Sequence, residues 1–200
     1  MHNFDTNIVK YIRSTGYKYH RLSFRFYLEI ETTAQNNDTA IVIMKNPAKA
    51  CINHLCINRN LNSKTAPVES DATVNHVIQK LGMQYKKIFI VNLYPFMHSH
   101  TKAVRRFLDC TRKPIMHIRS ITSRKNKIMI IQVLKSNRNA KIFCAWGQES
   151  NLCASKYAAR IYEFVAYCFR YHIQLGEFTS NGNNPWKPLS TFFPTHGSMW

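Results

Sequence analysis

The order of apolar and polar residues along this chain predicts an α/β domain, because strand-like and helix-like stretches alternate. From Phe24 to Ile30 every second residue is apolar, which is the period of a strand with one buried face. The stretches that predict strands are 24–30, 39–44, 87–92, 141–146 and 172–175. We expect them to form a central, mostly parallel sheet within a three-layer α/β/α domain.

The helix-like stretches lie between these strands. Ser70 and Asp71 offer an N-cap to a helix that ends at Gly82. Further helices are expected at 102–110 and at 127–134, although the second stretch is also compatible with a strand. The clearest helix is 154–171, whose inward face is expected to carry Tyr157, Ile161, Phe164, Val165 and Phe169.

The whole chain, residues 1–200, reads as one domain, because it shows no repeat and no linker. We expect residues 1–20 to form an N-terminal extension and residues 179–200 to form a loop-like tail, rich in Asn, Gly, Pro and aromatic residues. The polar stretch 46–69 is long for a connection inside a compact domain. Such connections are often functional, so we expect a functional loop there.

The charge of the chain points to a polyanionic partner. Lys and Arg number 28 against 10 Asp and Glu, a formal net charge of +18. Twelve of these bases lie between Lys102 and Lys141, where Asp109 is the single acid. We expect this region to bind nucleic acid, and a merely solvated basic face is the alternative. The residues expected to contact DNA from it are Arg105, Arg106, Arg112, Lys113, Arg124, Lys125 and Lys127.

Other features of the sequence argue against a secreted protein, a membrane-spanning protein, a zinc protein and a magnesium nuclease. The first residues carry no cationic segment followed by an apolar one, and no apolar run approaches the roughly 20 residues of a membrane span. The six cysteines form no C-x-x-C pair, and the spacing of Cys51 and Cys56 does not fit the common zinc sites. We therefore expect a cytoplasmic monomer with no metal and no cofactor. A magnesium nuclease is disfavoured because carboxylates are few and scattered.

Two asparagines follow the expected strands. Asn46 comes after 39–44, where Pro47 stiffens the turn, and Asn92 ends 87–92. Ligands of parallel α/β sheets bind outside the carboxyl ends of the strands, so we expect both side chains to lie beside a ligand. Tyr94 and Phe96 follow closely and are candidates for stacking on an unstacked base, with core packing as the alternative.

Several short blocks occur in an order that resembles a known family. They are Asn46-Pro47 with Ala50, Asp71 with Thr73, Val91-Asn92-Leu93, Ala145-Trp146-Gly147, and Pro188-Leu189. The ordered set resembles the domain-of-unknown-function family 1643, small prokaryotic and phage-borne proteins, over about residues 20 to 192. The arrangement is also similar to the uracil-DNA glycosylase superfamily. Where both families favour a His before the late Pro, this chain has Lys187, and His196 is an alternative for that role.

The second resemblance implies a monofunctional DNA glycosylase, which flips a base out of single- or double-stranded DNA and hydrolyses its N-glycosidic bond. The catalytic residues implied are Asn46, which would hold the attacking water, Asp71 and Lys187. Asp71 has an ordinary helix N-cap as its alternative role. The base-binding residues implied are Pro47, Asn92, Tyr94 and Phe96. Pro188, Leu189 and Ser190 would press into the minor groove.

The long 46–69 segment and the altered loop at Lys187 leave room for a modified base. Given the phage-borne setting of the family, the resemblance suggests action on modified phage DNA in antiviral defence. A non-catalytic DNA- or RNA-binding module on the same fold is the alternative function.

Overall fold

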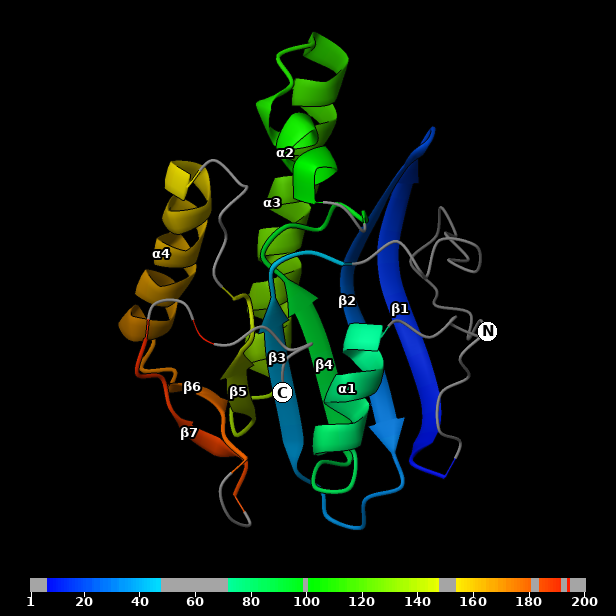
Figure 1. The fold of residues 1–200 in the computed structure, drawn as a ribbon, viewed down its shortest axis with the longest axis vertical. Helices are drawn as coiled ribbons and strands as arrows, with labels where there is room; N and C mark the ends of the chain where they lie inside the picture. Colours follow the sequence, from blue (N-terminus) through cyan, green and yellow to red (C-terminus); the bar gives the residue numbers. More distant parts are fainter. Residues whose placement is uncertain are drawn as a thin grey trace.

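The computed structural model describes residues 7–47, 72–98, 101–147, 154–180, 184–191 and 194. Within them, seven strands form one mixed sheet and four helices pack against it (Figure 1). The strands are β1 (Val9–Tyr19), β2 (Leu22–Thr32), β3 (Thr39–Met44), β4 (Lys87–Asn92), β5 (Lys141–Cys144), β6 (Leu175–Phe178) and β7 (Trp186–Pro188). The helices are α1 (Ala72–Leu81), α2 (Thr101–Asp109), α3 (Lys113–Ser136) and α4 (Ala154–Arg170).

The strand order in the sheet is β1-β2-β4-β3-β5-β6-β7. The central strands β4, β3, β5 and β6 run parallel, whereas β1, β2 and β7 join the sheet through antiparallel pairs. The α/β class is therefore confirmed. The sheet is mixed rather than mostly parallel, since three of the six strand pairings between neighbours are antiparallel.

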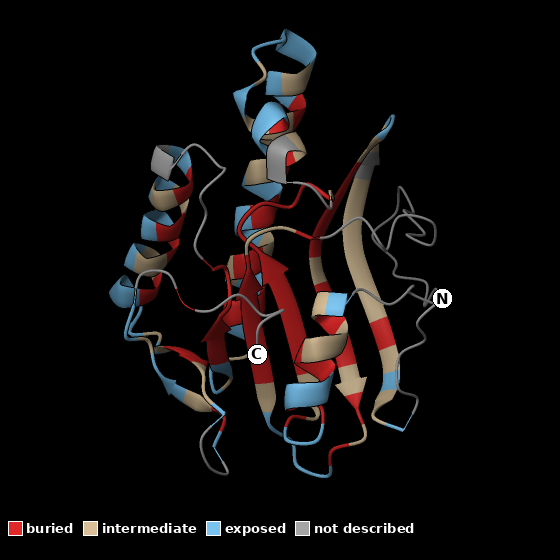
Figure 2. Cartoon of the chain, viewed as in Figure 1, coloured by how far each residue is buried: buried red, intermediate tan, exposed pale blue. Residues whose placement is uncertain are grey.

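Each face of the sheet carries its own apolar core. Residues of α2, α3 and α4 pack on one face, which we call the α3 face, and residues of α1 pack on the other, the α1 face (Figure 1). Along β3, Ile41 and Ile43 belong to the α3 face, and Ala40 and Val42 belong to the α1 face. Covering on both faces explains why β3 and β4 read as continuous apolar runs and appear buried throughout their centres in Figure 2.

The expected strands at 24–30, 39–44 and 87–92 and the expected helices near 72–81, 102–110 and 154–171 are confirmed. The stretch 127–134 is helical, as the second half of the 24-residue α3, so the strand alternative is wrong. The last parallel strand is β6, which begins at Leu175, where the expected strand 172–175 ended. On α4, Phe169 is 84% exposed and the buried Cys168 takes its place against the core.

The chain ends contribute more to the sheet than the sequence indicated. Residues 9–19 form β1 rather than an extension, and 186–188 of the expected tail form β7. The sequence of β1 shows no clear alternation of apolar and polar residues, because β1 is an edge strand whose side chains are mostly half-buried. The sheet also bulges where Gly16 faces Arg25: a Cβ on Gly16 would stand 2.3 Å from the Phe24 carbonyl oxygen.

Within the described parts of the chain, no helix combines the length and the apolar character that crossing a membrane requires.

Candidate functional site

The connections after β3 and β5 leave the sheet toward opposite faces. β3 leads to α1 on the α1 face, and its neighbour β5 leads to α4 on the α3 face. Adjacent parallel strands whose connections diverge in this way open a crevice at their carboxyl ends, which is where ligands bind in such sheets. The Ala145 N–H donates to the Ile43 carbonyl at 2.8 Å, which keeps the start of the second connection beside β3.

Asn46 joins the segments that follow β3 and β4. Its Nδ2 donates to the carbonyls of Pro47 and His98, both at 3.1 Å. Main-chain bonds reinforce the junction: Tyr94 N–H donates to the Lys45 carbonyl at 2.8 Å, and His98 N–H donates to the Pro47 carbonyl at 3.1 Å. Asn46 therefore lies at the expected edge of the sheet, but its amide nitrogen is engaged in holding two loops together, and Pro47 is buried beside it.

Asn92 ends β4 and is completely buried. Its neighbours Val91 and Leu93 belong to the α3-face core, so strand alternation places the Asn92 side chain on the α1 face with Ile90. Neither Oδ1 nor Nδ2 finds a hydrogen-bond partner among the described residues. Burying an amide without partners costs about 1–3 kcal/mol for each group left unpaired, which makes Asn92 a candidate ligand-binding residue.

The main chain beyond Asn92 is held from the α3 face. Asn126, a fully buried residue of α3, donates its Nδ2 to the carbonyls of Asn92 at 2.8 Å and Leu93 at 3.2 Å. Arg160 of α4 adds a bond from Nε to the Leu93 carbonyl at 3.2 Å. Neither Asn126 nor Arg160 was expected from the sequence to belong to the site. The available signal for Asn126 was a polar residue standing in the apolar face of a helix.

A basic groove of about 920 Å³ lies between the three helices of the α3 face and the segment after β4. We call it the α3–α4 groove. Aromatic residues, five bases and one acid are among the residues that line it. The bases are Arg119, Arg124, Lys127, Lys156 and Arg160, and the acid is Glu163. Arg124 and Lys127 were expected to contact DNA, whereas the two bases of α4 were not recognised from the sequence.

Ion pairs cross this groove. Lys127 of α3 and Arg160 both bind the Glu163 carboxylate of α4, and Lys156 of α4 binds Asp109 of α2 at 2.7 Å. The hydrogen bond from Lys127 lowers the pKa of Glu163, and the one from Lys156 lowers the pKa of Asp109. Both acids therefore remain ionised at neutral pH. A phosphate entering the groove would compete with these carboxylates for the same cations.

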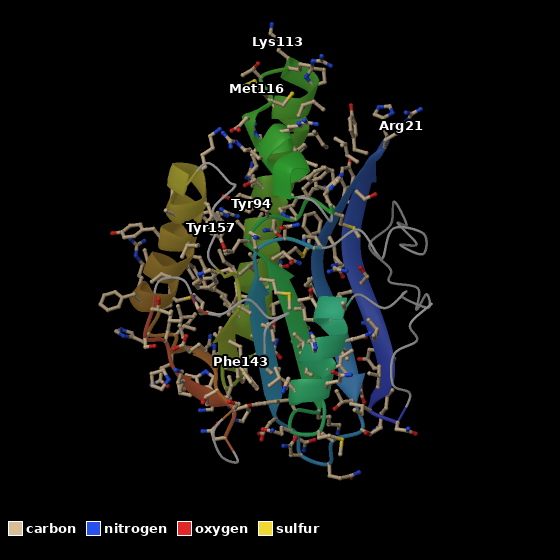
Figure 3. All side chains as sticks on the ribbon, in the orientation of Figure 1. Arg21, Tyr94, Lys113, Met116, Phe143 and Tyr157 are labelled. Atoms are coloured by element: carbon tan, nitrogen blue, oxygen red, sulfur yellow. The ribbon has the colours of Figure 1, made fainter. Side chains whose placement is uncertain are left out.

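The two aromatic candidates, Tyr94 and Phe96, pack against other rings of the core. Tyr94 stacks on Tyr157 with ring centroids 6.3 Å apart, and its hydroxyl donates to the Lys156 carbonyl at 3.0 Å (Figure 3). Phe96 stacks on Phe107 at 4.4 Å. Both rings are less than a tenth exposed and belong to the α3-face core. These contacts fit the packing alternative, although both residues also line the groove.

The remaining bases expected to contact DNA lie on α2, on α3 or directly before α3, and they do not line the groove. Arg105 pairs with Asp109 at 3.5 Å, and Lys125 lies over the Tyr17 ring at 5.0 Å. Arg106 is exposed on α2. Arg112 and Lys113 are exposed at the start of α3, and Figure 3 shows Lys113 at the top of the molecule.

The structure does not bring Lys187 to the asparagines. Lys187 lies on β7, four strands away from β4, which corresponds to about 19 Å at the usual strand spacing. Its ammonium pairs with the buried Glu177 carboxylate of β6 at 3.2 Å, and Ser190 donates to the same carboxylate. Pro188 pairs with Gly176, and the Leu189 N–H donates to Leu175 at 3.0 Å. The segment 187–190 is therefore bound to the edge of the sheet.

Several expected site residues lie outside the described residues. They are Asp71, His196 and most of the 46–69 segment, which also contains the cysteines Cys51 and Cys56. The described residues include no group of three or more His, Cys, Asp or Glu side chains placed to hold a metal ion. Burial raises the pKa of the Cys168 thiol to about 12, and it raises that of Cys144 well above its ordinary value, so both act as core residues.

Comparison with known proteins places the chain in a family. No curated protein and no solved structure matches it. One family model, described as Protein of unknown function (DUF1643), matches residues 25–189. The match spans 165 of the 200 residues (189 − 25 + 1) and runs from β2 to β7, so it includes Asn46, Asn92 and the α3–α4 groove. The chain therefore belongs to the DUF1643 family.

Proposed function

We propose that this protein is a DNA glycosylase that holds DNA along the α3–α4 groove and reads an extruded base with Asn92. The observation that carries the proposal is the Asn92 side chain, fully buried at the carboxyl end of β4 with both polar atoms unpartnered among the described residues. An amide offers a donor and an acceptor side by side, which is the pattern that a base edge presents. An extruded base satisfies both atoms at once.

The basic groove supports the choice of DNA as the substrate. Its five bases are accompanied by more exposed bases on α2 and at the start of α3, in a chain with a formal net charge of +18. Neutralising phosphates releases counterions and provides affinity that does not depend on sequence. In this proposal the phosphate backbone lies over the α3 face, and the extruded nucleotide crosses the end of β4 to reach the α1 face.

The proposal extends to the fold type and to the substrate. An Asn-Pro turn after the first parallel strand and an Asn ending the second support a glycosylase-like three-layer domain of the uracil-DNA glycosylase type. We further propose a modified base of phage DNA as the substrate and antiviral defence as the role. The catalytic roles of Asp71 and Lys187 stay predictions. In the proposed enzyme Asn46 fixes the loops around the base, because its amide nitrogen already binds two carbonyls.

The test is incubation of the protein with normal, uracil-containing, hydroxymethylated and glucosylated DNA, followed by alkali. Alkali-dependent breaks on one substrate would support the glycosylase and identify the class of its base. The Asn92→Ala variant should lose these breaks and keep its affinity for DNA. Asn139→Ala is the matched control, since Asn139 is exposed near the amino end of β5, and it should cut like the wild type.

A non-catalytic nucleic-acid-binding module is the second candidate. The observation that favours it is that two of the expected catalytic groups, Asn46 Nδ2 and the Lys187 ammonium, are both engaged in contacts that hold the fold. This candidate predicts tight, salt-sensitive binding without breaks on any of the four DNAs. It also predicts that Asn46→Ala lowers thermal stability and leaves DNA affinity unchanged, whereas in the glycosylase the same change should also slow cutting.

A further inference from the structure

Buried polar atoms without partners gather on the α1 face of the sheet. Among the described residues they include Nε and Nη1 of Arg25, both side-chain atoms of Asn92 and Oγ of Ser14. Arg25 is only 1% exposed. The proposed function gives Arg25 no role, although it is the largest polar side chain in the described core.

Arg25 lies two residues beyond the last β2–β4 pair, Tyr27 with Val91, at the end of β4 that carries Asn92. Phe24 and its β1 partner Tyr17 pack in the α3-face core, so the next residue, Arg25, points to the α1 face. β2 and β4 are neighbours in the sheet, and Arg25 N–H donates to the Pro95 carbonyl at 2.8 Å, three residues after Asn92. The guanidinium and the amide therefore occupy the same face, at the same end, of two adjacent strands.

A guanidinium in this position requires an anion. Arg keeps its charge in proteins, and a buried charge without a partner costs several kcal/mol. Among the described residues, no acid pairs with Arg25; Glu29 of the same strand pairs with Arg13 and Lys87 instead. A ligand that carries or develops negative charge next to Asn92 would remove this cost.

We propose that Arg25 and Asn92 together form the base pocket, and that Arg25 binds the negative charge that the base acquires as it leaves. This inference rests on the proposed glycosylase function. In the reaction, the water oxygen bonds to C1′ and the C1′–N bond breaks. The bonding electron pair departs with the base nitrogen, and the proton of the water finally neutralises the released base. A fixed cation facing the leaving base stabilises the transition state without reorganisation.

The chemistry of the pocket indicates a pyrimidine. In a pyrimidine the negative charge on the departing N1 delocalises onto the adjacent O2 carbonyl, which a guanidinium can bind through two N–H groups. A purine leaves through an imidazole nitrogen with no carbonyl beside it. Asn92 is then free to bind the remaining donor and acceptor edge of the ring.

The first test uses free bases, so it does not require DNA cleavage. At pH 8, 5-nitrouracil is an anion and thymine is neutral. We expect the wild type to bind 5-nitrouracil at least about tenfold more tightly than thymine in equilibrium titration. Arg25→Met should bind the two bases equally, while Arg21→Met, which alters an exposed Arg at the tip of the β1–β2 hairpin, should behave as the wild type (Figure 3). An unchanged preference in Arg25→Met, or full competition by inorganic phosphate, would overturn the base pocket.

The second test is kinetic and separates this inference from the proposed function. On whichever DNA the wild type cuts, Arg25→Met should lower the single-turnover rate by about 10²–10³-fold with little change in DNA affinity. If DNA is cut and Arg25→Met cuts at the wild-type rate, the inference fails and the glycosylase stands. If no DNA is cut but the preference for the anionic base depends on Arg25, the glycosylase fails and the pocket stands. Arg25→Gln repeats both tests should Arg25→Met not fold.

Discussion

The side-chain amide of Asn126 donates a 2.8 Å hydrogen bond to the main-chain carbonyl of Asn92, from the face opposite to the Asn92 side chain. The main chain and the side chain of Asn92 therefore have separate roles. Its main chain is fixed by α3, and its side chain is presented to the α1 face. This division predicts opposite effects for the same substitution at the two positions.

Replacing Asn126 by Leu should destabilise the protein. The change removes the bonds to the Asn92 and Leu93 carbonyls, of which the Leu93 carbonyl keeps its bond from Arg160. We expect a loss of about 2–4 kcal/mol in the free energy of unfolding, measured by urea denaturation. A loss below about 0.5 kcal/mol would show that the end of β4 does not depend on α3.

Replacing Asn92 by Leu should stabilise the protein and abolish its function. The Leu side chain has the same number of heavy atoms and the same branching, and the change removes two polar atoms that have no partner among the described residues. We expect a gain of about 1–2 kcal/mol in the free energy of unfolding, together with loss of base recognition. A destabilised Asn92→Leu would mean that the amide is already satisfied within the folded chain, and the site would lose its main support.

Replacing Glu163 by Gln should tighten DNA binding. The change frees Lys127 and Arg160 from a shared carboxylate, so two more cations of the groove can reach phosphates. The slope of log K against log salt should steepen by up to about 2. The control is Asp38→Asn, the same charge change at the start of β3, at the opposite end of the sheet. Equal effects of the two changes would indicate net charge rather than the groove.

Replacing Lys187 by Met should act on stability through Glu177. Burial alone would raise the pKa of Glu177, but the hydrogen bonds from Ser190 and Lys187 outweigh it, so the pKa in the folded protein lies below its ordinary value. A lowered pKa contributes stability above the unfolded-state pKa, and this contribution is lost as the pH falls through the folded-state pKa. Lys187→Met should therefore be less stable than the wild type at pH 7 by about 1 kcal/mol, and the gap should close in acid.

Thermal unfolding of both proteins from pH 7 down to pH 3 measures this difference. A gap that stays constant over the whole range would show that the pair with Glu177 contributes nothing. If Lys187→Met instead lost DNA cleavage at unchanged stability, the catalytic role expected from the sequence would be supported.

The sequence predicts two kinds of element well: strands that are buried on both faces of the sheet, and helices whose apolar residues recur at a regular spacing. β3 and β4 are continuous apolar runs, and α1 and α4 carry regular apolar faces. The first half of α3 was missed because its charged residues interrupt the apolar period, although Pro114 in its first turn is a sign of a helix start. β1 and β7 are edge strands, and their role depends on neighbours that are distant in the sequence.

The candidate site, like the fold, was predictable from the sequence only in part. Asn46 and Asn92 were located correctly at the carboxyl ends of strands, since that placement depends only on local patterns. Arg25, Asn126 and Arg160 could not be found in this way. Each lies inside a regular element, and its meaning depends on which strand lies next to it and which face it joins.

The strand order also has a consequence for how the chain reaches its fold during synthesis. β3 pairs on one side with β4 and on the other with β5, where Ala40 meets Lys141, 101 residues later (141 − 40). One edge of this apolar strand therefore stays without its partner until β5 has left the ribosome. Such long-range pairing slows folding, and an open apolar edge invites association with other chains. Nascent chains that stop before residue 141 should accordingly depend on chaperones more than the complete protein does.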